Sequence, residues 1–391
     1  MTTCVLDSER AALSRPLPSV SSPAVVLDAT AALARANELV DLGFRVRYAV
    51  KAAPVADLVL PLTAAGHGVD VASAAEVELA HELGVDSTRV IASHPTLPEP
   101  DVYWALARNV RLFVVDSLAQ LERLGASSDR LGVDRREVRV LVRVGFADPE
   151  ARYQLSEKFG VDVETATDLI LAASRLSLQA RGVAFHLGSQ AASPASATDA
   201  ATRALDLVRR AGLDDPIVDV GGGFPGTYPG AADWHPFAEA LATPLVGRVE
   251  TLAEPGRLLA SADSVVVTTV TQLVERGGVR VAHLDAGAYH GLMEFSPLVG
   301  RPLEAYLSVP AHPEPGPLAP TQLVGPTCDS LDRLFDGPVN LPAALAVGDR
   351  ILVESAGAYS VGVAAPFNGF AVPRVYVRAL DHASTRTTAA S

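Results

Sequence analysis

The sequence predicts an α/β protein in which a (β/α)8 TIM barrel is followed by a C-terminal β domain of sandwich-like or barrel-like form. Between about residues 45 and 256, short runs rich in β-branched residues alternate with Ala- and Leu-rich stretches of helical period, the pattern of repeated strand–helix units. The alternation supplies eight strands, the number that closes a parallel barrel. After about residue 260 the helical period gives way to short β runs separated by Pro- and Gly-rich turns.

Each expected barrel strand can be located in the sequence. The strands are RVRYAV (45–50), GVDVAS (68–73), RVIAS (89–93), RLFVVD (111–116), VRVLVRV (138–144), GVAFHLG (182–188), PIVDVGGG (216–223) and RVETLAEPG (248–256). Helical stretches such as SAAEVELAHELG and SLAQLERLG lie between them, and several end at Gly, as helices commonly do. We therefore assign residues 28–260 to the barrel.

The rest of the chain is assigned to the β domain. Residues 261–391 contain the β runs SVVVTTVTQLVER, VRVAHLDAG, RILVESAG and RVYVRAL. Within them, 309–322 is expected to be a Pro-rich loop and 381–391 a frayed tail. Residues 1–27 are expected to join this domain, with a strand in PSVSSPAVVLD (18–28).

Composition narrows the class of protein. A chain of 391 residues that is 49% hydrophobic can bury the cores of two domains. It has no apolar run of about 18 residues or more, and its N-terminal stretch lacks the pattern of a secretory signal, so we expect a cytoplasmic protein without a membrane span. Two cysteines, Cys4 and Cys328, form neither a disulfide framework nor a metal motif. The net charge of −13 argues against nucleic acid as a partner.

Several polar residues follow barrel strands, at the face where barrel active sites are built. Lys51 comes directly after the first strand, where an amine could bind a carbonyl covalently. Gly221–Gly223 end a late strand and could wrap a phosphate with bare N–H groups. In EPGR, Arg257 suits phosphate and Glu254 suits a protonated ring nitrogen. Taken singly, these are more often a surface lysine, a turn and a surface ion pair.

Four further residues have a plain and a functional interpretation. His186 in HLGSQ could stack on a flat ring and Ser189 could donate to a phosphate, although a lone His is more often a satisfied core residue. Cys328 and Tyr359 would ordinarily be buried core groups. A dinucleotide site is rejected, because GGGFPG lacks the GxGxxG spacing and falls late in the chain.

At these residues the chain resembles the pyridoxal-phosphate (PLP) decarboxylases of the ornithine and diaminopimelate decarboxylase family, known as fold type III or alanine-racemase-like. The matching segments, in order, are YAVKA, DVASAAE, RYQLSEKFG, HLGS, DVGGGFPG, EPGR, DAG, GPTCDSLD and GAYSVGVAAPFNGF. They span roughly residues 48 to 370. Each segment is weak alone, but their joint presence in this order is specific.

The resemblance implies roles for individual residues. Lys51 would bind PLP covalently, with Asp70, Glu76 and Arg143 close to it. His186 would stack on the cofactor ring, and Glu254 would pair with the ring nitrogen. The expected phosphate ligands are Ser189, Gly221, Gly222, Gly223, Arg257 and Tyr359. No metal is expected.

The resemblance also points to the reaction and the assembly. A carboxylate such as Glu254 keeps the ring nitrogen protonated, which favours decarboxylation over the racemisation of alanine racemases. Cys328 would enter the site of the partner subunit in a homodimer and guide protonation. The expected substrate-binding residues are Cys328, Asp329, Asp285, Tyr289 and Phe367.

The chain departs from the family pattern at the far end of the substrate. Ornithine decarboxylases usually have an acid immediately before the Gly of HLDAGAYHG, where this chain has Ala286, and Asp285 lies one residue earlier. No basic residue closely follows DAG to hold a distal carboxylate, since Arg301 lies well beyond it. Three readings therefore stay open: a decarboxylase of a free ornithine- or lysine-like amino acid, with Asp329 or Glu294 compensating; a decarboxylase of a conjugated or carrier-tethered amino acid; and a non-catalytic PLP-binding relative.

Overall fold

The computed structural model describes residues 19–313, 316–378 and 386–388. The chain divides into two compact units. The barrel unit comprises residues 33–225 and 232–256, and the β unit comprises residues 1–32, 226–231 and 257–391. The first 18 residues, on which the expectation about a signal peptide partly rests, lie outside the described residues.

The barrel unit contains a closed barrel of eight parallel strands, as the sequence predicted. In order around the barrel they are β2 (Arg45–Ala49), β3 (Gly68–Val71), β4 (Val90–Ala92), β5 (Leu112–Val115), β6 (Arg139–Val144), β7 (Gln179–Phe185), β8 (Ile217–Asp219) and β9 (Glu250–Ala253). The first and last strands close the ring through Arg45↔Leu252 and Val46↔Ala253. Closure leaves no sheet edge unpaired.

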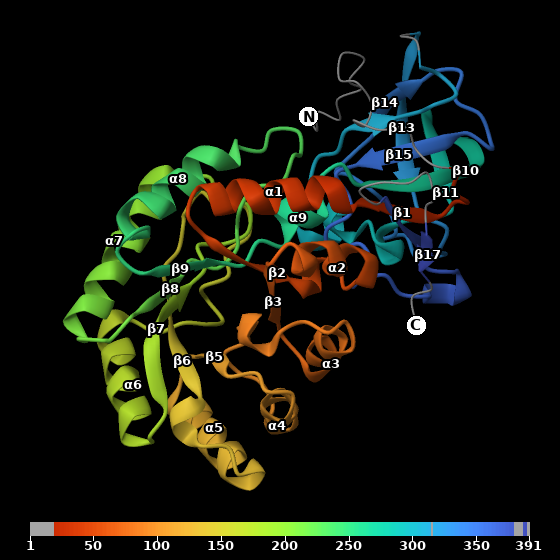
Figure 1. Ribbon diagram of the computed structural model, residues 1–391. Coiled ribbons are helices and arrows are strands. Elements are labelled where there is room, and N and C mark those ends of the chain that lie inside the picture. The colour runs from red at the N-terminus through yellow and green to blue at the C-terminus, as the bar shows by residue number, and fades with distance from the viewer. Residues whose placement is uncertain (1–18, 314–315, 379–385, 389–391) are drawn as a thin grey trace. The chain divides into compact units, whose positions relative to one another are not determined.

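One helix precedes the first barrel strand, and further helices follow the strands and lie outside them (Figure 1). They are α1 (Ala29–Asp41), α2 (Ala56–Ala64), α3 (Ala74–Glu82), α4 (Glu99–Ala107), α5 (Leu118–Leu131), α6 (Val163–Arg175), α7 (Pro194–Arg210) and α8 (Trp234–Leu245). Helix α6 illustrates why they form: Asp162 caps it by accepting the Thr165 N–H at 2.8 Å. Its buried residues recur at helical spacing and are Ala166, Leu169, Ile170 and Ala173.

The core of the barrel is apolar. One cluster of buried side chains from its strands consists of Ile91, Leu112, Val114, Leu141, Ala184, Ile217 and Leu252. These residues are at most 5% exposed. Burying them fixes which face of each strand points inward, because side chains alternate along a strand.

The β unit is built on a nine-stranded sheet within the described residues. Its strands are β1 (Ala24–Asp28), β10 (Val265–Arg276), β11 (Val279–Leu284), β12 (Leu307–Ser308), β13 (Leu318–Val324), β14 (Val339–Pro342), β15 (Arg350–Glu354), β16 (Arg374–Arg378) and β17 (Arg386–Thr388). A short helix, α9 (Arg257–Ala260), precedes β10. Short 3-10 helices complete the chain: η1 (Val50–Ala52), η2 (Ser87–Arg89), η3 (Arg135–Glu137), η4 (Ala288–His290), η5 (Met293–Phe295), η6 (Pro297–Val299) and η7 (Phe367–Gly369).

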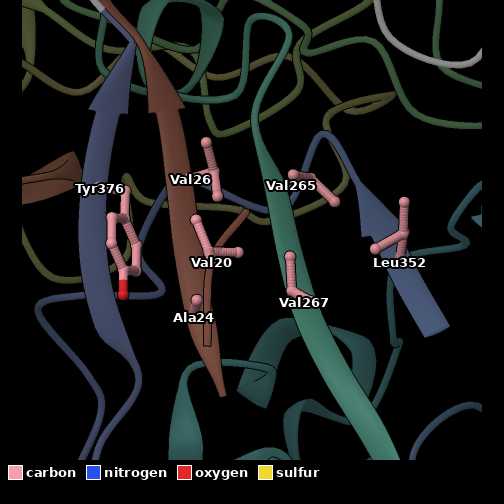
Figure 2. Packing of buried hydrophobic residues seen from close by; sticks show 7 residues of the cluster. All are labelled: Val20, Ala24, Val26, Val265, Val267, Leu352 and Tyr376. Carbon is pink, nitrogen blue, oxygen red and sulfur yellow. The ribbon is translucent and has the colours of Figure 1, made fainter. Parts of the chain in front are cut away.

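The N-terminal strand β1 lies inside this sheet. It pairs antiparallel with β10 and parallel with β16. Figure 2 shows the apolar cluster formed by these strands, by β15 and by the residues before β1. Its members are Val20, Ala24, Val26, Val265, Val267, Leu352 and Tyr376. The described part of residues 1–27 therefore contributes to the core of the β unit.

Two segments expected to be irregular contain strands. Residues 309–322 were predicted to be a loop, but β13 begins at Leu318. Pro320 is tolerated there because the pairing of β13 with β11 starts only at Thr321, so that at Pro320 the ladder includes β14 alone. In the predicted tail, Arg386–Thr388 form β17 against β16.

None of the described helices combines the length and the apolarity that crossing a bilayer requires. Among the described residues, no group of three or more His, Cys, Asp or Glu side chains is placed to hold a metal ion.

The barrel core provides a stability test. Leu141 is fully buried in β6, so Leu141→Ala should lower the free energy of unfolding by about 2–5 kcal/mol through lost burial and a residual cavity. The same change at Leu171, which is 50% exposed on α6, should cost less than about 1 kcal/mol. Chemical denaturation of both variants measures this, and equal costs would contradict the assignment of the core.

Candidate functional site

The predicted site residues of the barrel unit lie at the ends of its strands. Because the strands are parallel and closed, their carboxyl ends meet at one mouth of the barrel. Residues in or just after these ends are Lys51 after β2, Asp70 in β3, Arg143 in β6, His186 after β7, Gly221–Gly223 after β8 and Glu254 after β9. The topology therefore brings together residues that are up to about 200 positions apart in the chain.

Lys51 is held by a buried carboxylate. Its Nζ donates to Asp70 Oδ2 at 2.8 Å, and Ser93 Oγ donates to the other oxygen of Asp70. The Asp70 side chain is buried, whereas that of Lys51 is 45% exposed. Glu76 accepts the Ala72 N–H at 2.7 Å and secures the turn after Asp70. The arrangement fixes the amine of Lys51 while leaving it accessible.

His186 is neutral and oriented. Burial, with the nearby cations Arg143 and Lys51, lowers the pKa of His186 to about 3. Its Nδ1 accepts the Gly188 N–H at 3.1 Å, so that in the neutral ring Nε2 carries the proton. A neutral imidazole with a fixed plane can pack against a flat aromatic ring.

The glycine run after β8 allows close packing of backbone at the mouth. Gly221 and Gly223 have φ values of +68° and +92°, in the left-handed region that favours glycine. A Cβ at Gly222 would lie 2.8 Å from the carbonyl oxygen of Glu254 and 3.2 Å from Nε2 of His186. No larger residue fits there, so the bare backbone of the loop faces the site.

Glu254 carries a buried oxygen without a partner. The residue is 7% exposed, and among the described residues its Oε1 has no hydrogen-bond partner. Burial first, and then the charges of Asp219 and Asp70, raise the pKa of Glu254 well above its usual range. An orphaned acceptor of this kind requires an N–H or O–H donor.

Asp219 belongs to the same group of residues, although the sequence did not single it out. It is the last residue of β8 and is fully buried, with Oδ1 accepting the Gly221 N–H at 2.8 Å. The available signal was an acid inside the apolar strand of DVGGG, since buried acids are rare unless they are paired.

Arg143 and Ser189 complete the barrel residues. Burial lowers the pKa of Arg143, against the charges of Glu254, Asp219 and Asp70, and its guanidinium lies 5.7 Å from the Phe159 ring centroid. The Ser189 N–H donates to Tyr153 O at 2.9 Å. That bond links HLGS to RYQLSEKFG, two segments that the sequence analysis treated separately.

These observations fit the cofactor expected from the sequence. Lys51 supplies an accessible amine, Glu254 a buried acceptor for a ring N–H, His186 a flat neutral ring, and Gly221–Gly223 unobstructed backbone. A phosphorylated pyridine aldehyde needs each of these groups.

The β unit holds a second cluster, around Arg257. Its guanidinium makes a two-pronged ion pair with Glu294, at 2.6 and 2.7 Å, and donates to Tyr228 Oη at 3.2 Å. It also lies 4.9 Å from the ring centroid of Tyr359. The Arg257 side chain is 5% exposed and that of Glu294 is 20% exposed, so the cation is the better shielded of the two. Tyr228 was not predicted, because no motif in the sequence marks it.

The predicted substrate-binding residues of the β unit form a third group. Asp329 Oδ2 accepts the Tyr289 hydroxyl at 2.5 Å, and the Tyr289 ring lies 4.5 Å from that of Phe367. The Cys328 N–H donates to Asn368 Oδ1 at 3.3 Å, and Cys328 is an exposed free thiol. Cys4 lies outside the described residues.

Asp285 is engaged by the sheet. Its Oδ2 accepts the Ser22 hydroxyl at 2.5 Å, and its Oδ1 accepts the Thr268 hydroxyl and the Thr269 N–H, each at 2.8 Å. Both oxygens therefore stabilise the β unit. Its part in substrate binding stays a prediction.

Comparisons with known proteins place this geometry in context. The model of the pyridoxal binding domain of pyridoxal-dependent decarboxylases matches residues 28–261. The lysine/ornithine decarboxylase of Selenomonas ruminantium is 32% identical over 83% of this chain and 80% of that protein. The ornithine decarboxylase of Mus musculus is 29% identical over 84% of this chain and 74% of that protein.

Solved structures agree with these relatives. The lysine/ornithine decarboxylase of Vibrio vulnificus, in complex with cadaverine, superimposes with a TM-score of 0.80 at 30% identity and covers 91% of this chain and 92% of that chain. The diaminopimelate decarboxylase of Helicobacter pylori, complexed with L-lysine, gives a TM-score of 0.83 at 24% identity, with 94% of each chain covered. At that identity the second likeness concerns the fold alone.

The pKa of His186 predicts a pH dependence of stability. Below about pH 6.5 the unfolded chain takes up a proton at this residue and the folded chain does not, so stability is lost as the pH falls toward 3. Without bound cofactor, wild type should lose up to about 1.4 kcal/mol per pH unit more than His186→Asn. Denaturant unfolding from pH 7 to pH 4 measures this difference. His81→Asn, at an exposed histidine, is the control for loss of an imidazole. Parallel curves would contradict the assignment.

Proposed function

The chain belongs to the family of pyridoxal-dependent decarboxylases, and from that premise we propose that it decarboxylates a free basic L-amino acid such as lysine or ornithine, to give a diamine. It is a PLP-dependent amino-acid decarboxylase. What remains to be proposed is its substrate, the roles of its residues and its assembly.

The charge of the expected substrate end carries the proposal. The stretch 285–297 contains neither Lys nor Arg, and its two acids, Asp285 and Glu294, are already bound by the sheet and by Arg257. Asp329 adds a carboxylate beside the rings of Tyr289 and Phe367. An ammonium at the far end of a substrate is attracted by carboxylates and aromatic faces, whereas a distal carboxylate would require a cation there. The names of the relatives from Selenomonas and Vibrio, both lysine/ornithine decarboxylases, support the same class.

Each residue has a defined task in this mechanism. PLP, when bound, supplies the electron sink for the charge left at Cα when the α-carboxylate departs as CO2. Lys51 would hold the cofactor covalently through its amine, and Asp70 holds that amine in place. Glu254 accepts the ring N–H, while His186 packs against the ring.

Two further tasks fall to residues of the β unit. Arg257 would hold the phosphate, since Glu294 and Tyr228 already fix its orientation. Cys328 would give a proton to Cα after CO2 has left.

We assign the work of Cys328 to a homodimer. The thiol is exposed, and exposed apolar side chains come from the same segments: Leu331 is 54% exposed, and Phe367 and Phe370 are each 41% exposed. Apolar side chains gathered next to a reactive group are typical of a surface that another chain covers. In the proposed dimer Cys328 and Asp329 serve the site of the partner subunit.

The substrate and the covalent site can be tested together. PLP-loaded enzyme should release CO2 from lysine or ornithine. Mass spectrometry of the products measures this, with arginine, diaminopimelate and amide- or thioester-conjugated glutamate assayed in parallel. Lys51→Ala should lower turnover at least about a thousandfold. Borohydride reduction should fix PLP on Lys51 and leave the only other lysine, Lys158, free, so Lys158→Arg is the matched control. Turnover of conjugates alone would reject the proposed substrate, and labelling of Lys158 the proposed site.

The shared site predicts complementation. Lys51→Ala and Cys328→Ala, each nearly inactive alone, should recover about a quarter of wild-type activity when mixed and allowed to exchange subunits, because half the dimers are hybrids with one intact site of two. Mixing either variant with itself is the control. No recovery, with hybrid dimers demonstrated by native mass spectrometry, would place both residues in one subunit's site.

A further inference from the structure

Two buried acids lie at the carboxyl ends of neighbouring strands, Asp219 in β8 and Glu254 after β9. Asp219 lies opposite Leu252 in the strand register, and Glu254 follows Leu252 by two residues. The peptide of Gly221 links them, because its N–H donates to Asp219 Oδ1 at 2.8 Å and its carbonyl accepts the Glu254 N–H at 2.7 Å. The two acids are thus fixed relative to one another.

Each acid has an oxygen without a donor. Among the described residues, Asp219 Oδ2 and Glu254 Oε1 are buried and have no hydrogen-bond partner. A buried acceptor left in this state costs about 1–3 kcal/mol. Two ionised carboxylates offer acceptors only, so neither can satisfy the other. One proton between them turns one oxygen into a donor and satisfies both.

We propose that Asp219 and Glu254 share one proton in the folded protein, and that Asp219 is the positioning residue that sets the charge of Glu254. The pair then carries a single negative charge instead of two. Sharing is expected for carboxyl groups in contact away from water, since ionising both is strongly disfavoured.

The surrounding charges are consistent with one proton. The charged groups that face the pair are Arg47 on β2, Lys51 after β2, Asp70 on β3 and Arg143 on β6. Burial is the largest effect on both acids, and it raises the pKa of Asp219 to about 6 although Asp219 accepts the Gly221 N–H. The pKa of Glu254 is raised as well, first by burial and then by Asp219. Burial thus favours the protonated form of both acids.

The pair has a consequence for the cofactor, and this step rests on the proposed function of Glu254. A ring N–H that donates to Glu254 favours its ionised form. The shared proton then resides on Asp219 Oδ2 and is donated to Glu254. One negative charge balances one ring N–H, with no excess charge left in the barrel.

Infrared spectroscopy of the full-length protein without PLP tests the pair independently of activity. Wild type at pH 7 should show the C=O stretch of a protonated carboxyl group, which shifts in D2O and disappears when the pH is raised. Both Asp219→Asn and Glu254→Gln should lose it, because an amide N–H donor replaces the shared proton. Asp148→Asn is the matched control: Asp148 is equally buried, but its oxygens accept three backbone N–H groups, so it needs no proton.

The outcomes separate this proposal from the proposed function. Survival of the band at full intensity in either variant of the pair, or its absence from wild type, would overturn the shared proton even if lysine is decarboxylated. Loss of the band in both variants supports the pair even if the substrate proves to be different. Thermal unfolding of each variant establishes that the spectra come from folded protein.

Discussion

The closure of eight parallel strands into a barrel is the constraint on which the site depends. Closure requires β2 to pair with β9, and that pairing brings the residue after the first strand to the same mouth as the residue after the last. This register places Lys51 and Glu254, about 200 positions apart in sequence, at the same end of the barrel. Burial in this interior disfavours charge, which raises the pKa of Asp219 and lowers the pKa of His186.

Two cations among the predicted site residues are paired with carboxylates. Lys51 is paired with Asp70 in the barrel unit, and Arg257 is paired with Glu294 in the β unit. Such pairs add little net stability when buried. However, they restrict the rotation of the paired side chains. These side chains then do not have to reorganise when a ligand binds.

Much of the fold and part of the site could be predicted from the sequence. Strand positions were predictable because runs of β-branched residues alternate with stretches of helical period. Lys51 and Gly221–Gly223 were predicted because they follow strand ends, where the active sites of barrels lie. Asp219 was not predicted as a site residue, because Glu254 lies 35 residues away in the chain and only the pairing of their strands brings the two acids to neighbouring positions. Pro320 led to a wrong prediction of a loop. Proline in a local sequence indicates a loop, but a strand accepts it where the neighbouring strand needs no N–H from it.

The position of β1 has a consequence for how the chain is made. The strand lies between β10 and β16. Ala24 is therefore synthesised long before its pairing partners Val267 and Arg374. At about 5–20 residues per second, the ribosome adds the intervening stretch over tens of seconds, while the strand AVVLD has unpaired edges on both sides. A nascent chain of this protein therefore presents an aggregation-prone apolar edge throughout synthesis of the barrel. It should depend on chaperones more during translation than after release.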